Sequence, residues 1–163
     1  MKKDTLEHSA VDMKADSKSK EYITNGHYCA CFNLRKAARS VTQMYDEALR
    51  PAGVRGTQFA LLMAVQMVGP LTVNQLADSV VMDRTTLSRN LKLIENQGLV
   101  SIEPGKDKRE RMVNLTPAGE AVLEKSYPYW ENVQADIVNK MGLNEFERLL
   151  ELLNKTVMLS KEG

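Results

Sequence analysis

The sequence predicts a mainly α fold: a winged helix-turn-helix with a small β-hairpin as its wing, and further helices at its N-terminal and C-terminal ends. Three observations predict this class. Apolar residues recur every three or four positions over most of the chain, two short helices flank a turn near its middle, and an alternating stretch with a charged loop follows them. The length of 163 residues suits a single folded unit.

A polar tail and a long helix come first. Residues 1–26 combine charged and small side chains with few large apolar ones and no sustained period, which predicts a disordered tail. From Tyr28 onward apolar residues recur at helical spacing until Pro51 ends the pattern. The sequence therefore predicts one folded unit over 27–163, which begins with a helix over 27–50.

Three predicted helices follow in the middle of the chain. Thr57 is placed to cap a buried helix over 58–68, whose residues are apolar nearly all round. The segment Thr72–Gln75 has the form of a capping box and opens a short helix that ends near Ser79. Asp83 can cap the helix after that. The positions expected to face the core from this last helix are Leu87, Leu91, Ile94 and Leu99.

The period of the pattern changes after Gly98, a residue placed to end that helix. Val100 and Ile102 alternate with polar residues, and residues 104–108 form a charged loop before a second apolar stretch. This arrangement is typical of a β-hairpin. Residues 55–116 are therefore expected to form the winged helix-turn-helix domain.

Two helices end the chain. Thr116 followed by Pro117 is a cap with proline in the first helical turn, and Gly142 ends the long helix that starts there. The last helix carries apolar residues at a spacing of three and four. Residues 117–163 are thus expected to form two helices.

The overall charge is almost balanced, with 22 Lys and Arg against 21 Asp and Glu. This balance argues against a polybasic protein that coats nucleic acid or membranes indiscriminately, so any DNA binding depends on local charge. No apolar run approaches the roughly 18 residues that cross a bilayer, and the polar start does not resemble a secretion signal. We therefore expect a cytoplasmic protein with no membrane partner.

The chain contains few of the motifs and residues that enzymes typically use for catalysis. The sequence has no phosphate-binding glycine loop and no cluster of metal ligands, and His8 and His27 are its only imidazoles. We therefore predict no enzymatic activity, no cofactor and no metal site.

The outward side of the helix after Asp83 combines hydroxyl groups with guanidinium groups. Its members are Arg84, Thr85, Ser88 and Arg89. Small side chains allow a helix to approach the major groove closely, hydroxyls can bind phosphates or base edges, and arginine can bind guanine through two hydrogen bonds. The loop of the hairpin adds basic residues that can lie along a neighbouring minor groove: Lys106, Lys108, Arg109 and Arg111. Charge alone is equally typical of a solvated surface, so the order of the motifs matters more.

Three motifs follow one another in this region. They are Arg84-Thr-Thr-Leu-Ser-Arg89, Gly98-Leu-Val100 and Asp107-Lys-Arg-Glu-Arg-Met-Val-Asn-Leu-Thr116. In this order they resemble the MarR (multiple antibiotic resistance regulator) family of winged-helix repressors, and the last motif is the most specific. The resemblance covers nearly everything from about Tyr28 to the last helix.

This resemblance implies a homodimer. The helices over 27–50 and 117–163 form its dimerisation domain by intertwining with those of the partner, so that two winged domains sit in successive major grooves of a pseudo-palindromic DNA duplex. The recognition helix implied by the likeness carries Arg84, Thr85, Thr86, Ser88 and Arg89. Arg109 becomes the minor-groove arginine, and Asp107 orients it through a charge-assisted hydrogen bond. Val81 stands in the turn where such proteins often have glycine or a small polar residue. The implied function is a transcriptional repressor that an effector releases from its operator.

The first helix carries Cys31 near its start and Tyr45 further along. Both residues resemble the branch of the family in which an amino-terminal cysteine, helped by tyrosines of the partner subunit, is oxidised by organic hydroperoxides and weakens DNA binding. Arg35 and Gly56 stand where that branch has tyrosines. The alternative is that Cys29 and Cys31 are small residues of the dimer core, since free cysteines are commonly buried and inert.

A non-covalent effector, bound between the dimer helices and the winged domain, is the other option that the resemblance implies. Its expected walls are Tyr45, Met63, Met67 and Trp130. Methionine at helical spacing is also typical of a protein core, and no ligand class follows from these residues. The predicted partners are therefore double-stranded DNA, a second copy of the chain, and a small molecule or oxidant. A dimer scaffold that does not touch DNA is the alternative function, against which the complete wing motif argues.

Overall fold

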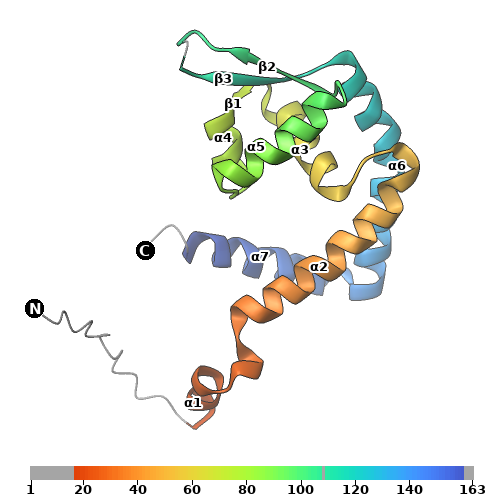
Figure 1. The fold of residues 1–163 in the computed structure, drawn as a ribbon. Helices are drawn as coiled ribbons and strands as arrows, with labels where there is room; N and C mark the ends of the chain where they lie inside the picture. Colours follow the sequence, from red (N-terminus) through yellow and green to blue (C-terminus); the bar gives the residue numbers. More distant parts are fainter. Residues whose placement is uncertain (1–16, 108, 160–163) are drawn as a thin grey trace, which may run out of the picture. The chain divides into compact units, whose positions relative to one another are not determined.

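The computed structural model describes residues 17–107 and 109–159 (Figure 1). In chain order the elements are α1 (Ser17–Thr24), η1 (Gly26–Tyr28), α2 (Ala30–Leu49), η2 (Arg50–Ala52), α3 (Gly56–Val68), β1 (Leu71–Thr72), α4 (Val73–Ser79), α5 (Arg84–Asn96), β2 (Val100–Pro104), β3 (Arg111–Leu115), α6 (Pro117–Met141) and α7 (Leu143–Leu159). Helices predominate, so the predicted mainly α class with a hairpin wing is confirmed. The chain divides into two compact units, one up to Ser40 and one from Val41, and each is described by itself.

The first unit contains α1, η1 and the start of α2. Residues 17–24 belong to the segment for which the sequence predicts a disordered tail, but they form α1, so the expectation needs correction there. Residues 1–16 lie outside the described part of the chain. The side-chain oxygen of Asn25 caps η1 by accepting a hydrogen bond from the backbone amide of His27 at 3.0 Å. Residues 20–40 are exposed throughout.

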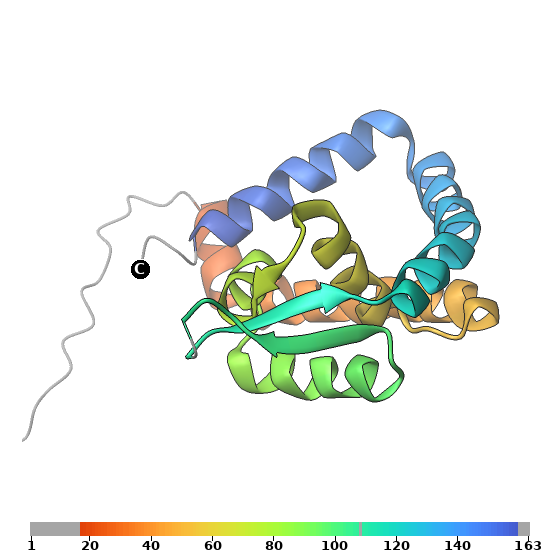
Figure 2. The same ribbon diagram turned by 90° about the horizontal axis from the view of Figure 1, so that it is seen from above.

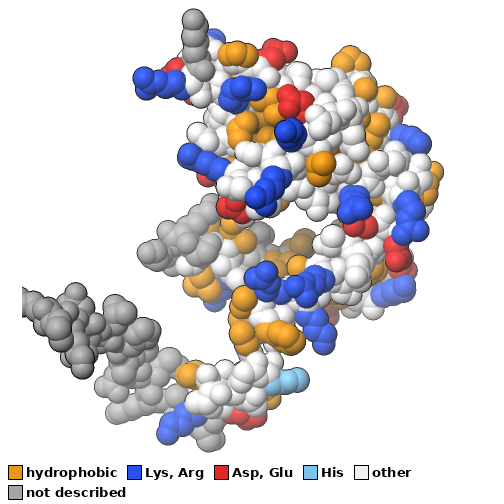
Figure 3. Space-filling model, viewed as in Figure 1, with side chains coloured by type: hydrophobic (Ala, Val, Ile, Leu, Met, Phe, Trp, Pro, Cys, Tyr) orange, Lys and Arg blue, Asp and Glu red, His pale blue; other side chains and the backbone are white. Residues whose placement is uncertain are grey.

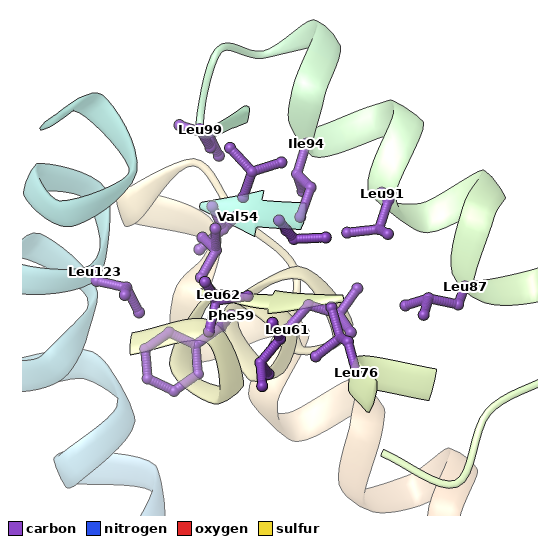
Figure 4. Close-up of a cluster of buried hydrophobic side chains, with 14 of the residues drawn as sticks. Val54, Phe59, Leu61, Leu62, Leu76, Leu87, Leu91, Ile94, Leu99 and Leu123 are labelled. Atoms are coloured by element: carbon purple, nitrogen blue, oxygen red, sulfur yellow. The ribbon is translucent and has the colours of Figure 1, made fainter. Parts of the chain in front are cut away.

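The second unit encloses one hydrophobic core with α3 at its centre. The buried residues of α3 are Phe59, Leu61, Leu62 and Val65, as its nearly continuous apolar sequence predicts. The four positions expected to face inward from α5 and its end are Leu87, Leu91, Ile94 and Leu99, and all are buried. Figure 4 shows side chains of α4, α5 and α6 converging on those of α3. Burial of this continuous cluster is the main force that holds the unit together.

The start of α3 differs from the prediction. Gly56 is its first residue, so Thr57 lies within the helix and does not cap it. A carboxylate oxygen of Asp46 on α2 accepts a hydrogen bond from the backbone amide of Gly56 at 2.7 Å. The side chain of Gln58 accepts another from the amide of Arg55 at 2.9 Å. The amides at the start of a helix need such acceptors, and the one from Asp46 is supplied by the preceding helix.

Helices α4 and α5 form the helix-turn-helix, and both begin at the predicted caps. The Thr72 hydroxyl accepts from the amide of Gln75 at 3.1 Å, and the Gln75 side chain accepts from the amide of Thr72 at 2.9 Å, which completes the capping box. Asp83 caps α5 by accepting from the amide of Thr86 at 2.9 Å. In the turn between the helices, Val81 has a φ of +50°, in the left-handed region that β-branched residues rarely adopt.

The wing is the β2–β3 hairpin, which β1 extends to a three-stranded antiparallel sheet of order β1-β3-β2. Val113 of β3 is the central residue of this sheet, because it pairs with Leu71 of β1 and with Ile102 of β2. Its side chain is fully buried. Figure 2 shows α5 running beside the hairpin, so the wing and the helix-turn-helix form one domain.

Helix α6 begins at the predicted Thr116 cap. Its first turn packs closely against Gly98 and Leu99, which follow α5. The Thr116 hydroxyl accepts a hydrogen bond from the amide of Gly119 at 3.1 Å and donates one to the carbonyl of Gly98 at 2.6 Å. Gly119 lies so close to the carbonyl oxygen of Leu99 that a Cβ atom would overlap it. The glycine is therefore required by this close approach of two backbones.

Helix α7 follows Gly142 and has no buried residue. Its exposed large apolar side chains are Leu143, Leu150, Leu152, Leu153, Val157, Met158 and Leu159. Leu150, Leu153 and Val157 among them are spaced three and four residues apart and therefore lie on one side of the helix. Among the helices of residues 17–107 and 109–159, none combines the length and apolar character needed to span a bilayer.

Candidate nucleic-acid interface

The outer surface of α5 presents the side chains that the sequence assigns to DNA. Arg84, Thr85, Thr86, Ser88 and Arg89 are all exposed, whereas Leu87 among them is fully buried. Helical spacing separates the two faces, because Leu87 lies on the same side of α5 as Leu91 and Ile94, which are also buried. In Figure 3, Lys and Arg side chains are visible around the wing and the helix-turn-helix.

The first turn of α5 is fixed by Asp83. Hydrogen bonds from Thr86 lower the pKa of the Asp83 carboxyl below its ordinary value of 3.8. The group is therefore ionised at neutral pH and holds the amides at the start of the helix. This cap sets the direction in which Arg84 and Thr85 leave the backbone.

The tip of the wing is closed by hydrogen bonds within its loop. A carboxylate oxygen of Asp107 accepts a hydrogen bond from the backbone amide of Arg109 at 2.9 Å. Its carbonyl accepts one from the amide of Glu110 at the same distance, and Gly105 donates to the carbonyl of Glu110 at 3.0 Å. Lys106, Arg109 and Arg111 are exposed. Lys108 lies outside the described residues.

The charge-assisted hydrogen bond expected between Asp107 and Arg109 is present, and it involves the backbone amide of Arg109. The hydrogen bond joins the carboxylate to the backbone of Arg109, and within the described residues no ion pair links it to the guanidinium group. A side chain that binds the amide two residues later forms a local turn.

Recognition helix and wing come together around one hollow of about 390 Å3. Ser88 of α5 lines it on one side, and Arg109 and Arg111 of the wing line it on another. Side chains from two elements that are separated in sequence therefore face the same space. Four other predicted contact residues do not line this hollow. They lie on the exposed surface of α5 and are Arg84, Thr85, Thr86 and Arg89.

Sequence reasoning did not assign the other residues that line this hollow to the site; they are Thr72, Val73, Asn74, Leu91, Lys92, Glu95, Ile102 and Glu110. Lys92 lies one helical turn after Ser88 on α5, and Asn74 lies in the first turn of α4. The signal for Lys92 was its spacing of four residues from Ser88, which puts both on one side of a helix. Asn74 had no such signal, because its place depends on how α4 packs against the hairpin.

A second cavity, of about 380 Å3, lies between α2, α3, α6 and the turn before α5. It is lined by Tyr45, Met63 and Trp130, which the sequence assigns to an effector pocket. Met67, the fourth residue of that set, does not line it and is 77% exposed near the end of α3. The Tyr45 hydroxyl donates a hydrogen bond to the side chain of Gln134 on α6.

The cysteines belong to the first unit. Cys29 and Cys31 are exposed free thiols, so in the single chain neither is a buried core residue. At the other end of α2, a Cβ atom on Gly56 would come within 3.2 Å of the Cβ atom of Tyr45. This is closer than an ordinary contact, so a Cβ atom at position 56 would require Tyr45 to move by a few tenths of an ångström. Among the described residues, no group of three or more His, Cys, Asp or Glu could hold a metal ion.

Comparison with known proteins gives a consistent result. A family model described as the MarR family matches residues 52–110, which span the helix-turn-helix and most of the wing. The transcriptional regulator HosA of Escherichia coli O127:H6 is 31% identical over 99 residues, covering 60% of this chain and 73% of HosA. The uncharacterised HTH-type regulator YwoH of Bacillus subtilis is 29% identical over 92 residues, covering 56% of this chain and 67% of YwoH.

A solved structure extends the comparison to the helices outside the winged domain. The transcriptional regulator MosR of M. tuberculosis, crystallised in complex with DNA, is 37% identical to this chain. The match covers 81% of this chain and 98% of MosR, with a TM-score of 0.72. The similarity therefore includes almost the whole of the MosR chain.

Proposed function

This chain belongs to the MarR family of transcriptional regulators, and from that premise we propose a homodimeric repressor that binds a pseudo-palindromic operator and leaves it when an effector binds. The observation that carries the DNA contact is the hollow shared by Ser88 on α5 and by Arg109 and Arg111 on the wing. In this proposal α5 enters the major groove and Arg109 the adjacent minor groove. The proposed site of action is the cytoplasm.

The exposed residues of the two elements have different tasks in this proposal. Arg84 and Arg89 read base edges, since arginine can form paired hydrogen bonds with guanine. Thr85, Thr86 and Ser88 bind phosphates or base edges through short side chains that let α5 approach closely. On the wing, Lys106, Lys108 and Arg111 add phosphate contacts that depend on salt concentration.

The DNA contact is tested by titrating a labelled duplex from the region upstream of the chain's own gene while following its fluorescence anisotropy. Arg109→Ala should weaken binding about tenfold to a hundredfold, the range for one specific arginine contact. Lys125→Ala is the matched control, because it removes one exposed positive charge from α6, far from the hollow in sequence. If Arg109→Ala binds the duplex as tightly as the wild type, the wing does not contribute to the interface. If the wild type itself does not bind DNA, the alternative function, a dimer scaffold that does not touch DNA, is favoured.

The proposed dimer is supported by the apolar side chains that the single chain leaves exposed. Leu150, Leu153 and Val157 recur at helical spacing along α7, and Phe32 on α2 is 62% exposed. A second copy would remove such surfaces from water, which is the largest favourable term in association. Two copies would then present two winged domains, about 34 Å apart if they occupy successive turns of the duplex.

Light scattering after size-exclusion chromatography tests this dimer. Leu153→Glu should shift the mass from two chains toward one, because it places a charge in the apolar face of α7. Asn154→Glu puts the same charge on the neighbouring exposed position and should leave the dimer intact. Equal behaviour of the two variants would argue against α7 as an interface. Repression itself is measured with a reporter gene behind the upstream region.

Thiol sensing through Cys31 is a second candidate for the signal, and the exposure of this thiol in the single chain supports it. The Cys31 sulfur would attack one oxygen of a hydroperoxide, giving a sulfenic acid and releasing an alcohol. Tyr45, the tyrosine that such a mechanism would use, already donates its hydroxyl to Gln134. For this reason we place the non-covalent effector first.

The two signals are separated by adding cumene hydroperoxide to the protein–operator complex. In the thiol model, DNA binding is lost and dithiothreitol restores it, whereas Cys31→Ser keeps binding DNA in the oxidant. Cys29→Ser is the matched control, since it removes the neighbouring exposed thiol and should respond as the wild type does. Indifference of the wild type to the oxidant would eliminate Cys31 as the sensor.

A further inference from the structure

The recognition helix α5 has a hollow on each of its two flanks. The wing-side hollow, described above, is lined by Ser88 and Lys92 of α5 together with the wing. Another hollow, of about 1020 Å3, is lined by Asn90, Leu93 and Gln97 of α5. At roughly 100° per residue, Asn90 lies about 200° around the helix from Ser88, so the two sets of side chains face opposite sides. The second hollow is therefore on the flank of α5 that faces away from the wing.

The other wall of this second hollow is the segment that joins α2 to α3 and contains η2, so we name it the η2-side hollow. Arg50 and Arg55 of this segment are exposed, and both line the hollow. The residues around them include Leu49, Ala52 and Val54, which are buried in the core. Such closely spaced anchors hold the backbone that carries the two arginines in place.

Two hydrogen bonds also tie the start of α3 to its neighbours at this hollow. The carboxylate of Asp46 on α2 accepts from the backbone amide of Gly56 at 2.7 Å. The side-chain amide of Gln58 on α3 donates to the side-chain oxygen of Gln97, just after α5, at 3.1 Å. The arginine-bearing segment and the recognition helix are therefore held together by direct contacts.

The formal charges of the two hollows are equal. Among the described residues that line the η2-side hollow, Arg50 and Arg55 are basic and Asp46 is acidic, which gives a formal charge of +1. Three basic and two acidic residues line the wing-side hollow, which also gives +1. Positive charge on both flanks of one helix favours anions on both sides of it.

The width of the major groove brings phosphates to both flanks of a helix that enters it. The groove is about 12 Å wide, and a helix with its side chains is about 10–12 Å across, so the helix nearly fills the groove. The backbones of the two DNA strands form the edges of the groove. With α5 in the groove, as proposed above, one backbone runs along the wing-side hollow and the other along the η2-side hollow.

We propose that Arg50 and Arg55 bind backbone phosphates of the DNA strand that runs along the flank of α5 opposite the wing. The inference rests on the DNA-binding function proposed above and adds contact residues that lie outside α4, α5 and the wing. Arginine suits this task because its planar group can donate two hydrogen bonds to one phosphate. Contacts on both strands fix the position of α5 in the groove without reading bases.

Neutral variants and a salt titration test these contacts. In a dimer, Arg50→Gln and Arg55→Gln each remove two contacts from the duplex, because both copies lose one. The slope of log affinity against log salt concentration should therefore become shallower by about 1.8, at about 0.9 per phosphate. Affinity should fall about tenfold for the upstream duplex and for a scrambled duplex alike. Lys125→Gln is the matched control and should change neither value, because it removes an exposed charge of α6.

Arg55→Lys separates loss of charge from loss of structure. It keeps the positive charge, so it should retain the salt slope of the wild type and only part of the affinity. Wild-type slopes in both glutamine variants would overturn the proposal. Weakening confined to the upstream duplex would also overturn it, because contacts to bases and not to phosphates give that result.

Duplexes that carry one neutral methylphosphonate at a time locate the contacts on the DNA. The wild type should lose affinity at positions on both strands of the groove. Arg55→Gln should become insensitive at positions of one strand, and Lys92→Gln at positions of the other, because neutralising a phosphate matters little once its cation is gone. The assignment to opposite flanks is wrong if both variants become insensitive on the same strand, or if Arg55→Gln keeps the wild-type pattern.

The same titrations separate this inference from the function on which it rests. A wild type that binds neither duplex refutes both. A wild type that binds the upstream duplex, and is weakened by Arg109→Ala but not by Arg50→Gln or Arg55→Gln, retains the proposed function and refutes the contact with the second strand alone.

Discussion

The carboxylate of Asp107 accepts a hydrogen bond from the backbone amide of Arg109 at 2.9 Å across the tip of the wing. Asp107→Ala should therefore loosen the loop and weaken operator binding about three- to tenfold, the value of one such hydrogen bond. Asp107→Asn should keep most of the affinity, because an asparagine oxygen can accept from the same amide. Anisotropy titrations of the three proteins check this. If the asparagine variant is as weak as the alanine variant, the charge of Asp107 matters and the local turn does not.

Val81 offers a test of backbone strain. A left-handed φ of +50° disfavours a β-branched residue by about 1–2 kcal/mol, and glycine adopts it freely. After subtraction of the larger chain entropy of unfolded glycine, Val81→Gly should raise the free energy of unfolding by about 0.5–1 kcal/mol. Urea denaturation measures this change.

The matched variant in the same turn is Val80→Gly. Val80 has a φ of −98° and is half-buried, so the glycine relieves no strain there and removes apolar contacts. This variant should be less stable than the wild type. Destabilisation by Val81→Gly as well would show that the side chain of Val81, although 58% exposed, contributes more than its backbone conformation costs.

Replacing Gly119 by alanine should destabilise the protein, although the same replacement usually stabilises a helix. At an ordinary interior position, glycine to alanine favours the helix by about 1 kcal/mol. At Gly119 the new Cβ atom would overlap the carbonyl oxygen of Leu99, so Gly119→Ala should lower the free energy of unfolding by about 1–3 kcal/mol. Ala121→Gly, two residues on and exposed, should cost about 1 kcal/mol by propensity alone. A stabilised Gly119→Ala protein would contradict the close packing of α6.

The cap of α5 gives a pH dependence of known sign. Because hydrogen bonds from Thr86 lower the pKa of Asp83 in the folded chain, its stabilising effect is present above the ordinary value of 3.8 and is lost as the pH falls through the lowered value. Asp83→Asn retains a capping side chain that does not titrate. The difference in melting temperature between wild type and Asp83→Asn should therefore shift against the wild type between about pH 5 and about pH 2. A difference that does not change over this range would show that Asp83 is not held by these bonds.

Local signals in the sequence were sufficient for much of the winged domain. Thr72, Asp83 and Thr116 cap their helices as predicted, because the capping oxygen and the amide that donates to it lie within three residues of each other. The inward side of α5 was also predictable, since burial follows the helical period. These features depend on residues that are close in sequence.

Features that depend on distant residues were not predictable in the same way. The amide of Gly56 is satisfied by Asp46, ten residues earlier on another helix, so Thr57 looked like the cap. Met67 follows Met63 by one helical turn and shared its periodic signal, but it lies beyond the packed part of α3. The absence of charge in the cavity around Trp130 required knowledge of which helices meet there. Only the folded chain contains that information.

Thr72 takes part in two structures at once. Its backbone pairs with Met112 in the sheet that carries the wing, and its side chain caps α4. The hairpin and the helix-turn-helix are therefore joined directly at Thr72, so a movement of the wing would also disturb the start of α4. If a duplex presents its two grooves at a different angle, the mismatch has to be met by bending or twisting the DNA. The stiffness of base steps that the protein never touches would then contribute to its choice of operator.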